Sequence, residues 1–259
     1  MKYIGVILLF LTAILLALIL FIYNLKSESF STSSKTTIPK TIIQTWKSHE
    51  IPLKYKKQIE SVKNTNRNFK ILFFTDEDIE TFLKENYPHY YVTYKKLPIK
   101  IQKIDFFRYV AIYHYGGFYY DLDIEAFKPL DNLVNNEVVF PIEQKINNTC
   151  SVPRFRYLCK HKCHQILGNY AFGAIPKSDF LKVLIDNIHN NIDDIIEDYK
   201  KNKNRSYYVY QTTGPDYISL MYNNYTNKKN IRILNNVYDI RKHYFGEYAI
   251  HTWAGTWKV

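Results

Sequence analysis

The sequence lacks both the glycine-rich fingerprint of dinucleotide-binding folds and the phosphate-binding P-loop. Both motifs bring backbone amides close to phosphates, so their absence argues against a nicotinamide enzyme and a P-loop ATPase. The chain also has no internal repeat and no long low-complexity segment. Its 259 residues, 46% of them hydrophobic, are enough for one large domain with a substantial core.

Cysteine is scarce as well, and all three cysteines cluster at Cys150, Cys159 and Cys163, next to His161 and His164. Their spacing matches no standard zinc finger. In an oxidising compartment, one disulfide and one free thiol are favoured over a metal site. Which two cysteines pair is left open by the sequence.

The formal charge of +11, from 35 basic and 24 acidic residues, permits nucleic acid, an anionic membrane or an anionic small molecule as a partner. The lysines are scattered rather than gathered on one helix, which indicates a solvated surface. We therefore expect no nucleic-acid partner. The 24 tyrosines and 16 phenylalanines predict an aromatic-rich core and aromatic-rich clefts.

Residues 3–23 carry no charged side chain and consist almost entirely of apolar residues. About 20 such residues are enough for a helix to cross a bilayer. The segment ends without the small-residue cleavage site of a signal peptide, so it predicts an uncleaved signal anchor. The flanking charges favour an N-terminus in the cytosol. The rest of the chain is then expected in the lumen of a secretory compartment such as the Golgi, or outside the cell.

Three parts are expected along the chain: a cytosolic stub with the transmembrane anchor (1–25), a flexible stem (26–37) and a folded domain (38–259). The stem is polar and rich in serine and threonine. Glycosylation sequons begin at Asn147, Asn204 and Asn224, in agreement with a luminal domain.

Within the domain, apolar strands alternate with helices. The pattern predicts strands at 41–46, 69–74 and 118–122 and helices at 53–62 and 99–115. Thr75 is the expected cap of a further helix, and Gly116 and Gly117 are expected to end the helix at 99–115. This alternation is typical of an α/β sandwich with a mainly parallel sheet, in which ligands bind beyond the carboxyl ends of the strands.

Asp121 and Asp123 lie one residue apart at the end of the aromatic strand that follows the glycine pair. Two carboxylates in such a turn can hold a divalent cation and leave coordination positions open for substrate phosphates. A departing nucleoside diphosphate needs a site of this kind. On its own the Asp-x-Asp triplet is weak, because it also occurs in solvated turns.

Asp105 and Arg108 are three residues apart on the helix that precedes this strand, so they share one face. Their neighbours are apolar or aromatic, which predicts a largely buried helix. A surface ion pair is the alternative. On a buried helix, however, a charged pair costs free energy and favours a functional site.

Five segments in order resemble the DXD-containing sugar transferases of glycosyltransferase family 32: 38–46 (IPKTIIQTW), 104–109 (IDFFRY), 115–123 (YGGFYYDLD), 213–215 (TGP) and 251–258 (HTWAGTWK). The resemblance extends over 38–259 and points toward yeast-type α-1,6-mannosyltransferases and inositol-phosphoceramide mannosyltransferases. The Asp-x-x-Arg and Asp-x-Asp spacing is also similar to that of the large clostridial glucosylating toxins.

This resemblance implies a GT-A, Rossmann-like nucleotide-sugar-binding domain that transfers a hexose with retention of configuration. The residues expected to bind the donor are Trp46 on the base, Asp105 and Arg108 on sugar hydroxyls, Tyr119 in the wall of the cleft, Asp121 on ribose or metal, and Trp257 on a phosphate oxygen. The residues expected to hold Mn²⁺ or Mg²⁺ are Asp121, Asp123 and His251. Asn169 matches a further polar position.

The nearest likeness favours mannose from GDP-mannose, with glucose, galactose or N-acetylglucosamine from a UDP-sugar as the alternative. The acceptor is expected to be a glycan or glycolipid hydroxyl, bound near 147–164. The family suggests a front-face displacement in which the diphosphate accepts the acceptor's proton. A non-catalytic glycan- or lipid-binding protein on the same scaffold is a second hypothesis, against which the complete set of site residues argues.

Overall fold

The computed structural model describes residues 18–19, 36–146, 150–239 and 241–253. The chain divides into two units, Met1–Thr36 and Thr37–Val259, and the fold below is that of the second. The expected anchor at 3–23 lies outside the described residues, apart from Leu18 and Ile19. In the described part of the chain, no helix combines the length and apolar character needed to cross a membrane.

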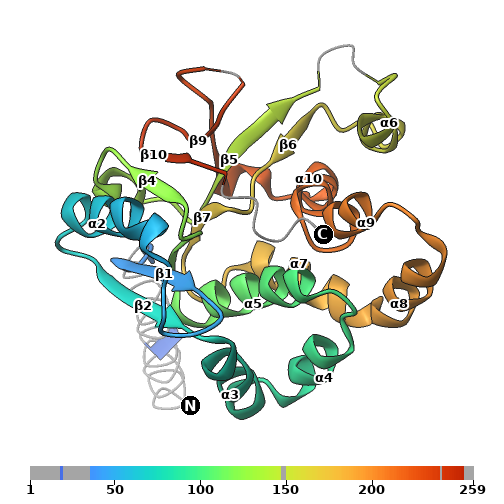
Figure 1. The fold of residues 1–259 in the computed structure, drawn as a ribbon, viewed down its shortest axis with the longest axis horizontal. Helices are drawn as coiled ribbons and strands as arrows, with labels where there is room; N and C mark the ends of the chain where they lie inside the picture. Colours follow the sequence, from blue (N-terminus) through green and yellow to red (C-terminus); the bar gives the residue numbers. More distant parts are fainter. Residues whose placement is uncertain (1–17, 20–35, 147–149, 240, 254–259) are drawn as a thin grey trace, which may run out of the picture. The chain divides into compact units, whose positions relative to one another are not determined.

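The described residues form an alternation of helices and strands (Figure 1). The helices are η1 (Leu53–Tyr55), α2 (Lys56–Thr65), α3 (Asp76–Asn86), α4 (Pro88–Lys96), α5 (Lys100–Tyr115), η2 (Leu130–Leu133), α6 (Pro153–Lys160), α7 (Asp179–Asn190), α8 (Ile192–Lys201), α9 (Arg205–Thr212), α10 (Pro215–Asn224) and η3 (Lys228–Asn230). The strands are β1 (Thr41–Thr45), β2 (Lys70–Phe74), β3 (Gly117–Tyr120), β4 (Ile124–Ala126), β5 (Val138–Lys145), β6 (Gln165–Leu167), β7 (Ala171–Ala174), β8 (Ile231–Leu234), β9 (His243–Phe245) and β10 (Ala249–His251).

The large sheet has seven strands in the order β2-β1-β3-β7-β5-β6, with β8 also paired to β5. β1 is parallel to β2 and to β3, and β5 is parallel to β8. The β3–β7, β5–β7 and β5–β6 pairs are antiparallel. The expectation of a mainly parallel sheet is therefore wrong. In the described residues between Ile124 and Ala174 there are four strands and one α-helix, too few crossovers to keep every strand parallel.

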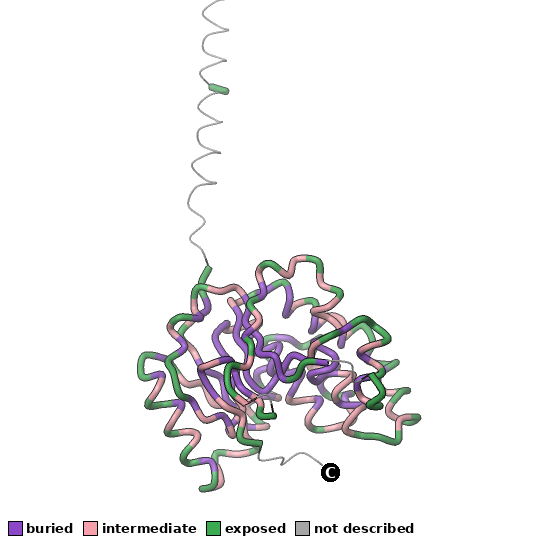
Figure 2. Tube along the Cα trace, turned by 90° about the horizontal axis from the view of Figure 1, so that it is seen from above, coloured by how far each residue is buried: buried purple, intermediate pink, exposed green. Residues whose placement is uncertain are grey.

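Apolar residues cover both faces of the large sheet, and successive residues of each strand alternate between two cores. Ile43 and Tyr119 face the larger core, which contains side chains of α3, α4, α5 and α7. Ile42 and Phe118 face the smaller core beside α2 and the small sheet β4-β10-β9. Figure 2 shows the buried stretches inside this unit and the exposed ones around it. Burial on both faces explains why these strands read as unbroken apolar runs.

Helix α5 and the turn after it follow the sequence prediction closely. The helix begins at Lys100 and ends at Tyr115, followed by Gly116 with φ 65° and Gly117 with φ 100°. A Cβ atom at Gly117 would lie 2.5 Å from the carbonyl oxygen of Thr41. Glycine is the residue that adopts this backbone conformation readily and has no Cβ atom to clash with Thr41. Gly117 therefore allows β3 to pair directly with β1.

A disulfide joins Cys150 to Cys159 and closes the segment that carries α6, while Cys163 is a buried free thiol. The expectation of one disulfide and one spare cysteine is confirmed. Among the sequon asparagines, Asn204 and Asn224 are exposed, and the sequon at 147–149 lies outside the described residues.

Candidate functional site

A cleft of about 970 Å³ opens where strands β1, β3 and β10 end. Its walls come from segments far apart in the sequence: the chain after β1, one face of α5, the turn after β3, and residues of α9 and β10. Asp121 and Asp123 line it, directly beyond the carboxyl end of β3. Their predicted location just beyond the carboxyl end of the strand is confirmed; that a ligand binds there stays a prediction.

Arg108 connects helix α5 to the turn after β3. Its Nη1 lies 3.0 Å from Oδ1 of Asp105, and its Nη2 lies 2.8 Å from Oδ1 of Asp121. The side chains of Arg108 and Asp105 are 7% and 3% exposed, which confirms the prediction of a charged pair on a buried helix. A buried ion pair of this kind is costly to break, so it fixes the positions of all three side chains.

Hydrogen bonds from two other segments hold Asp105. The Thr213 hydroxyl donates to Oδ2 at 2.9 Å, and the Asn169 side-chain amide donates to Oδ1 at 2.9 Å. Burial raises the pKa of Asp105 to about 7, because lost hydration outweighs the attraction of Arg108 and these hydrogen bonds. Asn169 and Thr213 therefore fix the Asp105 carboxylate, and a role for them in donor binding stays a prediction.

Tyr119 differs from the expectation that it lines the donor cleft. It is 1% exposed and lies outside the cleft wall, because β3 turns its side chain into the larger core. Its hydroxyl donates to Oδ1 of Asp121 at 2.8 Å, and its ring lies 4.8 Å from the Arg108 guanidinium carbon. Tyr119 thus supports Asp121 and Arg108 from beneath the cleft.

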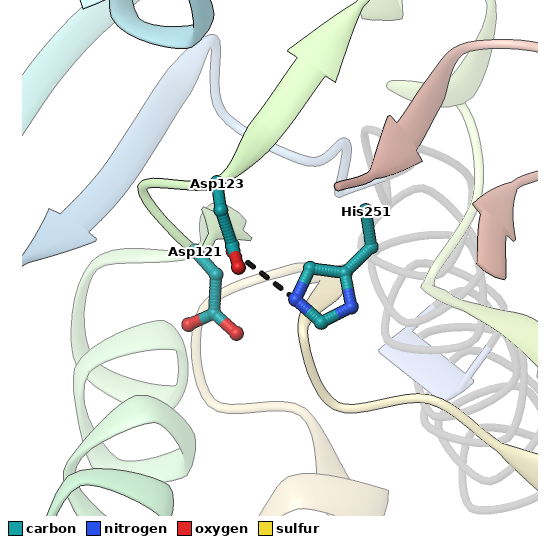
Figure 3. Close-up of side chains that lie close together, drawn as sticks. All are labelled: Asp121, Asp123 and His251. Carbon is teal, nitrogen blue, oxygen red and sulfur yellow. Dashed lines mark ion pairs between the residues drawn. The ribbon is translucent and has the colours of Figure 1, made fainter. Parts of the chain in front are cut away.

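Asp121, Asp123 and His251 form the candidate metal centre. One ligand atom from each residue lies within 4.8 Å of the others, and Figure 3 shows the three side chains converging. Nε2 of His251 is 3.1 Å from Oδ1 of Asp123. Burial raises the pKa of Asp121, with Arg108 acting in the opposite direction. Two carboxylates and an imidazole, partly buried and close together, fit a divalent cation.

Pairing in the small sheet brings His251 to the aspartates. In the β10–β4 pair, His251 lies opposite Ile124, the residue after Asp123. The Thr252 backbone N–H and hydroxyl both donate to the carbonyl oxygen of Asp123, at 2.9 and 2.8 Å. The ring of Tyr170 stacks on the His251 imidazole with centroids 4.7 Å apart. These contacts fix the histidine relative to the turn that carries the carboxylates.

Trp46 lines the cleft just after β1, with its ring 5.2 Å from that of Tyr55 in an edge-on arrangement. Its indole nitrogen is buried and has no hydrogen-bond partner among the described residues. A buried N–H without a partner is costly unless a ligand accepts from it. Trp257, the other expected tryptophan, lies outside the described residues.

A second charged cluster was missed at the level of sequence. Arg154, on α6, contacts Asp216 of α10 with Nη2–Oδ1 and Nε–Oδ1 distances of 2.6 and 3.0 Å. Its Nη2 is also 3.5 Å from Oε1 of Glu143 on β5, and its guanidinium carbon lies 4.2 Å from the Tyr210 ring. Glu143 lines the cleft. The available signal was an acidic residue directly after an apolar strand run.

Residues 52–140 match the family model described as "Glycosyltransferase sugar-binding region containing DXD motif". Inositol phosphoceramide mannosyltransferase 2 of Schizosaccharomyces pombe is 27% identical over 203 residues, covering 78% of this chain and 51% of the relative. Inositol phosphoceramide mannosyltransferase 1 of the same yeast is 32% identical, covering 58% and 43%. The chain thus spans about half the length, or less, of these curated relatives.

Among solved structures, the PaToxG glycosyltransferase superposes with a TM-score of 0.47 at 14% identity, covering 71% of this chain and 69% of that one. Among curated sequences, an uncharacterised glycosyltransferase of Acanthamoeba polyphaga mimivirus is 37% identical over 100 residues, covering 38% of this chain and 40% of that protein. Residues 52–140 are thus similar to the DXD-containing sugar-binding region of glycosyltransferases, and the curated relatives that match this chain are glycosyltransferases.

Proposed function

We propose that this chain is a retaining hexosyltransferase of GT-A fold, which moves a hexose from a nucleotide sugar to a hydroxyl of a glycan or glycolipid. One observation carries the proposal: Arg108 joins Asp105 to Asp121 in the wall of a cleft where Asp123 and His251 converge with Asp121. Fixed positive and negative groups at the end of a parallel strand pair suit a sugar bound to a diphosphate.

The donor is proposed to be GDP-mannose, with a UDP-hexose as the alternative. The names of the yeast relatives, inositol phosphoceramide mannosyltransferases, support mannose as the sugar and an inositol phosphoceramide as a first acceptor to test. Trp46 would stack on the base, and Trp257 would reach a phosphate oxygen. Nε of Arg108, buried and without a partner among the described residues, is available to donate to the donor sugar.

Asp121, Asp123 and His251 would hold Mn²⁺ or Mg²⁺. When bound, the cation acts as a Lewis acid on the phosphate oxygens of the leaving group. Asp105 and Arg108 orient the sugar, and the rigid contacts of Asp105 with Thr213 and Asn169 limit its movement. Transfer passes through an oxocarbenium-like state. In the proposed front-face displacement, the departing diphosphate accepts the proton of the acceptor hydroxyl.

The proposed arrangement in the cell is a type II membrane protein, with residues 1–25 as stub and anchor, 26–37 as stem and 38–259 in the lumen of the Golgi or a related compartment. The Cys150–Cys159 disulfide supports an oxidising compartment. The exposed sequon asparagines Asn204 and Asn224 are accessible to glycosylation there.

The test uses the full chain in detergent with Mn²⁺, and it measures nucleoside diphosphate release from GDP-mannose, UDP-glucose, UDP-galactose and UDP-N-acetylglucosamine, with and without inositol phosphoceramide. We expect release from one donor, abolished by EDTA and lowered about 100-fold or more by Asp123→Asn. Asp193→Asn is the matched control, because Asp193 is 83% exposed and, in the part of the chain that the structure describes, pairs with Lys96.

Normal turnover by Asp123→Asn would show that the metal centre is misassigned. If the wild-type chain neither releases nor binds any of the nucleotides, the enzyme hypothesis fails, and a non-catalytic glycan-binding protein becomes the better reading. The identity of the donor that is used decides between the GDP and UDP alternatives.

A further inference from the structure

One acidic side chain in the wall of the cleft comes from a strand of the large sheet and belongs neither to the Arg108 cluster nor to the candidate metal centre. Glu143 belongs to β5, and the strand order β1-β3-β7-β5 places β5 two strands beyond the strand that leads to Asp121. Trp46 follows β1, on the opposite side of β3. If the nucleotide lies toward Trp46 and the diphosphate lies near Asp123, Glu143 is on the side left for the second substrate.

A β-bulge directs Glu143 into the cleft. In the β5–β6 pair, Ile142 is opposite Leu167 and Gln144 is opposite Ile166, so two steps along β5 match one step along β6. Glu143 is the extra residue. Bulges of this kind re-aim a side chain and occur often beside active sites. Here the bulge interrupts the apolar run of β5 with a carboxylate that is only 7% exposed.

The contacts of Glu143 leave its carboxylate with unused acceptor capacity. Among the described residues, its polar contacts are to Arg154 at 3.5 Å and His243 at 3.9 Å, both at Oε1. Arg154 is held much closer by Asp216, at 2.6 Å. A carboxylate can accept about four hydrogen bonds, and burying one with only long contacts costs free energy. A hydroxyl donor in the cleft would supply the missing short contact.

The rim beside Glu143 offers a surface for a sugar ring. Trp253 lines the same cleft, is 42% exposed, and packs against His243 with ring centroids 4.9 Å apart. His243 in turn faces Glu143. An exposed indole next to a buried carboxylate combines an apolar face with a hydrogen-bond acceptor, the pairing that orients ligands in most small-molecule sites.

We propose that Glu143 binds the acceptor: its carboxylate accepts a hydrogen bond from a hydroxyl of the acceptor sugar or polyol, which packs against Trp253. Asp216 fixes Arg154, and Arg154 lies 3.5 Å from Glu143; neither side chain enters the cleft wall, so both are positioning residues. The inference rests on the proposed transferase function. The inference gives a binding role to the part of the cleft wall that β5 provides, which the DXD motif does not include.

The test compares wild type and Glu143→Gln in the full chain, using GDP-mannose or the donor found to turn over, with inositol phosphoceramide and methyl α-mannoside as acceptors. We expect turnover to fall about 10- to 100-fold while the affinity for the nucleoside diphosphate with Mn²⁺ stays within about twofold. If the enzyme only hydrolyses the donor, water takes the place of the acceptor. Glu143→Gln must then lower the hydrolysis rate by the same factor while the diphosphate affinity stays unchanged.

Glu143→Asp keeps the negative charge, so its turnover rate should lie between those of Glu143→Gln and wild type while its diphosphate affinity stays at the wild-type value. If Glu143 had a merely structural role, restoring the charge would not restore the rate in this way. Glu247→Gln is the matched control, because Glu247 is 46% exposed and pairs with Lys128. Wild-type turnover in Glu143→Gln, or equal losses of diphosphate affinity and rate, would overturn the inference while Asp123→Asn still reports on the transferase. Absence of wild-type turnover overturns both.

Discussion

Arg108 lies between a buried and a half-buried carboxylate, and Arg154 lies between two buried carboxylates; each is also beside a tyrosine ring. Only the Arg108 cluster lines the cleft as a unit. Arg108 is within 3.0 Å of both Asp105 and Asp121, and all three side chains line the cleft. Arg154 lies 2.6 Å from Asp216 and 3.5 Å from Glu143, and neither Arg154 nor Asp216 lines the cleft. The same combination of charges therefore serves as a rigid wall in one place and as a support for Glu143 in the other.

The segment after α9 connects the two clusters. The Thr213 hydroxyl donates to Asp105, and Asp216, three residues later at the start of α10, holds Arg154. A shift of this segment would disturb both clusters together. The donor and acceptor sides of the proposed reaction are thus set by one short stretch of backbone.

The largest effects are expected from replacing each arginine, which tests whether the two clusters have different roles. Arg108→Met and Arg154→Met each leave buried carboxylates without their partner, so we expect each to lower the free energy of unfolding by about 3–5 kcal/mol. Only Arg108→Met should also weaken nucleoside diphosphate binding, because Arg108 holds Asp121. Urea unfolding and calorimetric titration with GDP or UDP in Mn²⁺ measure the two effects.

Arg241→Met is a control for arginine removal outside both clusters and outside the cleft wall, since the Arg241 side chain is 85% exposed and pairs with Asp239. Equal losses of diphosphate affinity in Arg108→Met and Arg154→Met would contradict the division into a donor-side and a supporting cluster.

Thr213→Val tests how much the segment after α9, which contacts both clusters, contributes to the Arg108 cluster. Valine has nearly the same shape but leaves Oδ2 of Asp105 without its hydroxyl donor, so we expect a loss of about 1–2 kcal/mol of unfolding free energy. Thr81→Val, at an exposed position of α3, should change stability by less than about 0.5 kcal/mol. A Thr213→Val variant as stable as wild type would mean that this hydrogen bond contributes little to the Arg108 cluster.

The smallest expected effect is a pH dependence from Asp105. Its pKa is raised to about 7, above the value of about 3.9 in an unfolded chain, so its contribution to stability is present at low pH and lost as the pH rises through 7. Between pH 8 and pH 6, wild type should gain about 1 kcal/mol more than Asp105→Asn. Unfolding curves of both proteins at the two pH values measure this difference, and identical gains would refute it.

Much of the fold could be predicted because local patterns determine it. The apolar run before Gly116 predicted α5 within one residue, and the cap at Thr75 forms a capping box with Asp78. Helix α4 was not predicted, since its tyrosine-rich sequence has little helical periodicity. Strand β7 and its antiparallel pairing with β3 were not predicted either, because strand pairing depends on distant residues that no local pattern reveals.

The candidate site shows the same division between local and distant information. Asp105, Arg108, Asp121 and Asp123 were found because two short motifs contain them, and the structure brings them into one cleft. Their roles in binding stay predictions. Glu143 and Arg154 were missed because their meeting depends on the order of strands and on a bulge, neither of which the linear sequence displays.

The Cys150–Cys159 bridge ties one side of the cleft to the chemistry of the surrounding compartment. It closes the loop that carries Arg154, whereas the Arg108 cluster contains no cysteine. Closing a loop restricts the unfolded and partly folded chain, so an oxidising compartment favours the folded form of the segment that carries Arg154. On the proposed roles of the two clusters, a chain made in a reducing cytosol should bind the donor but hold the acceptor less well, so an assay of that chain should record more hydrolysis and less sugar transfer than one of the oxidised chain.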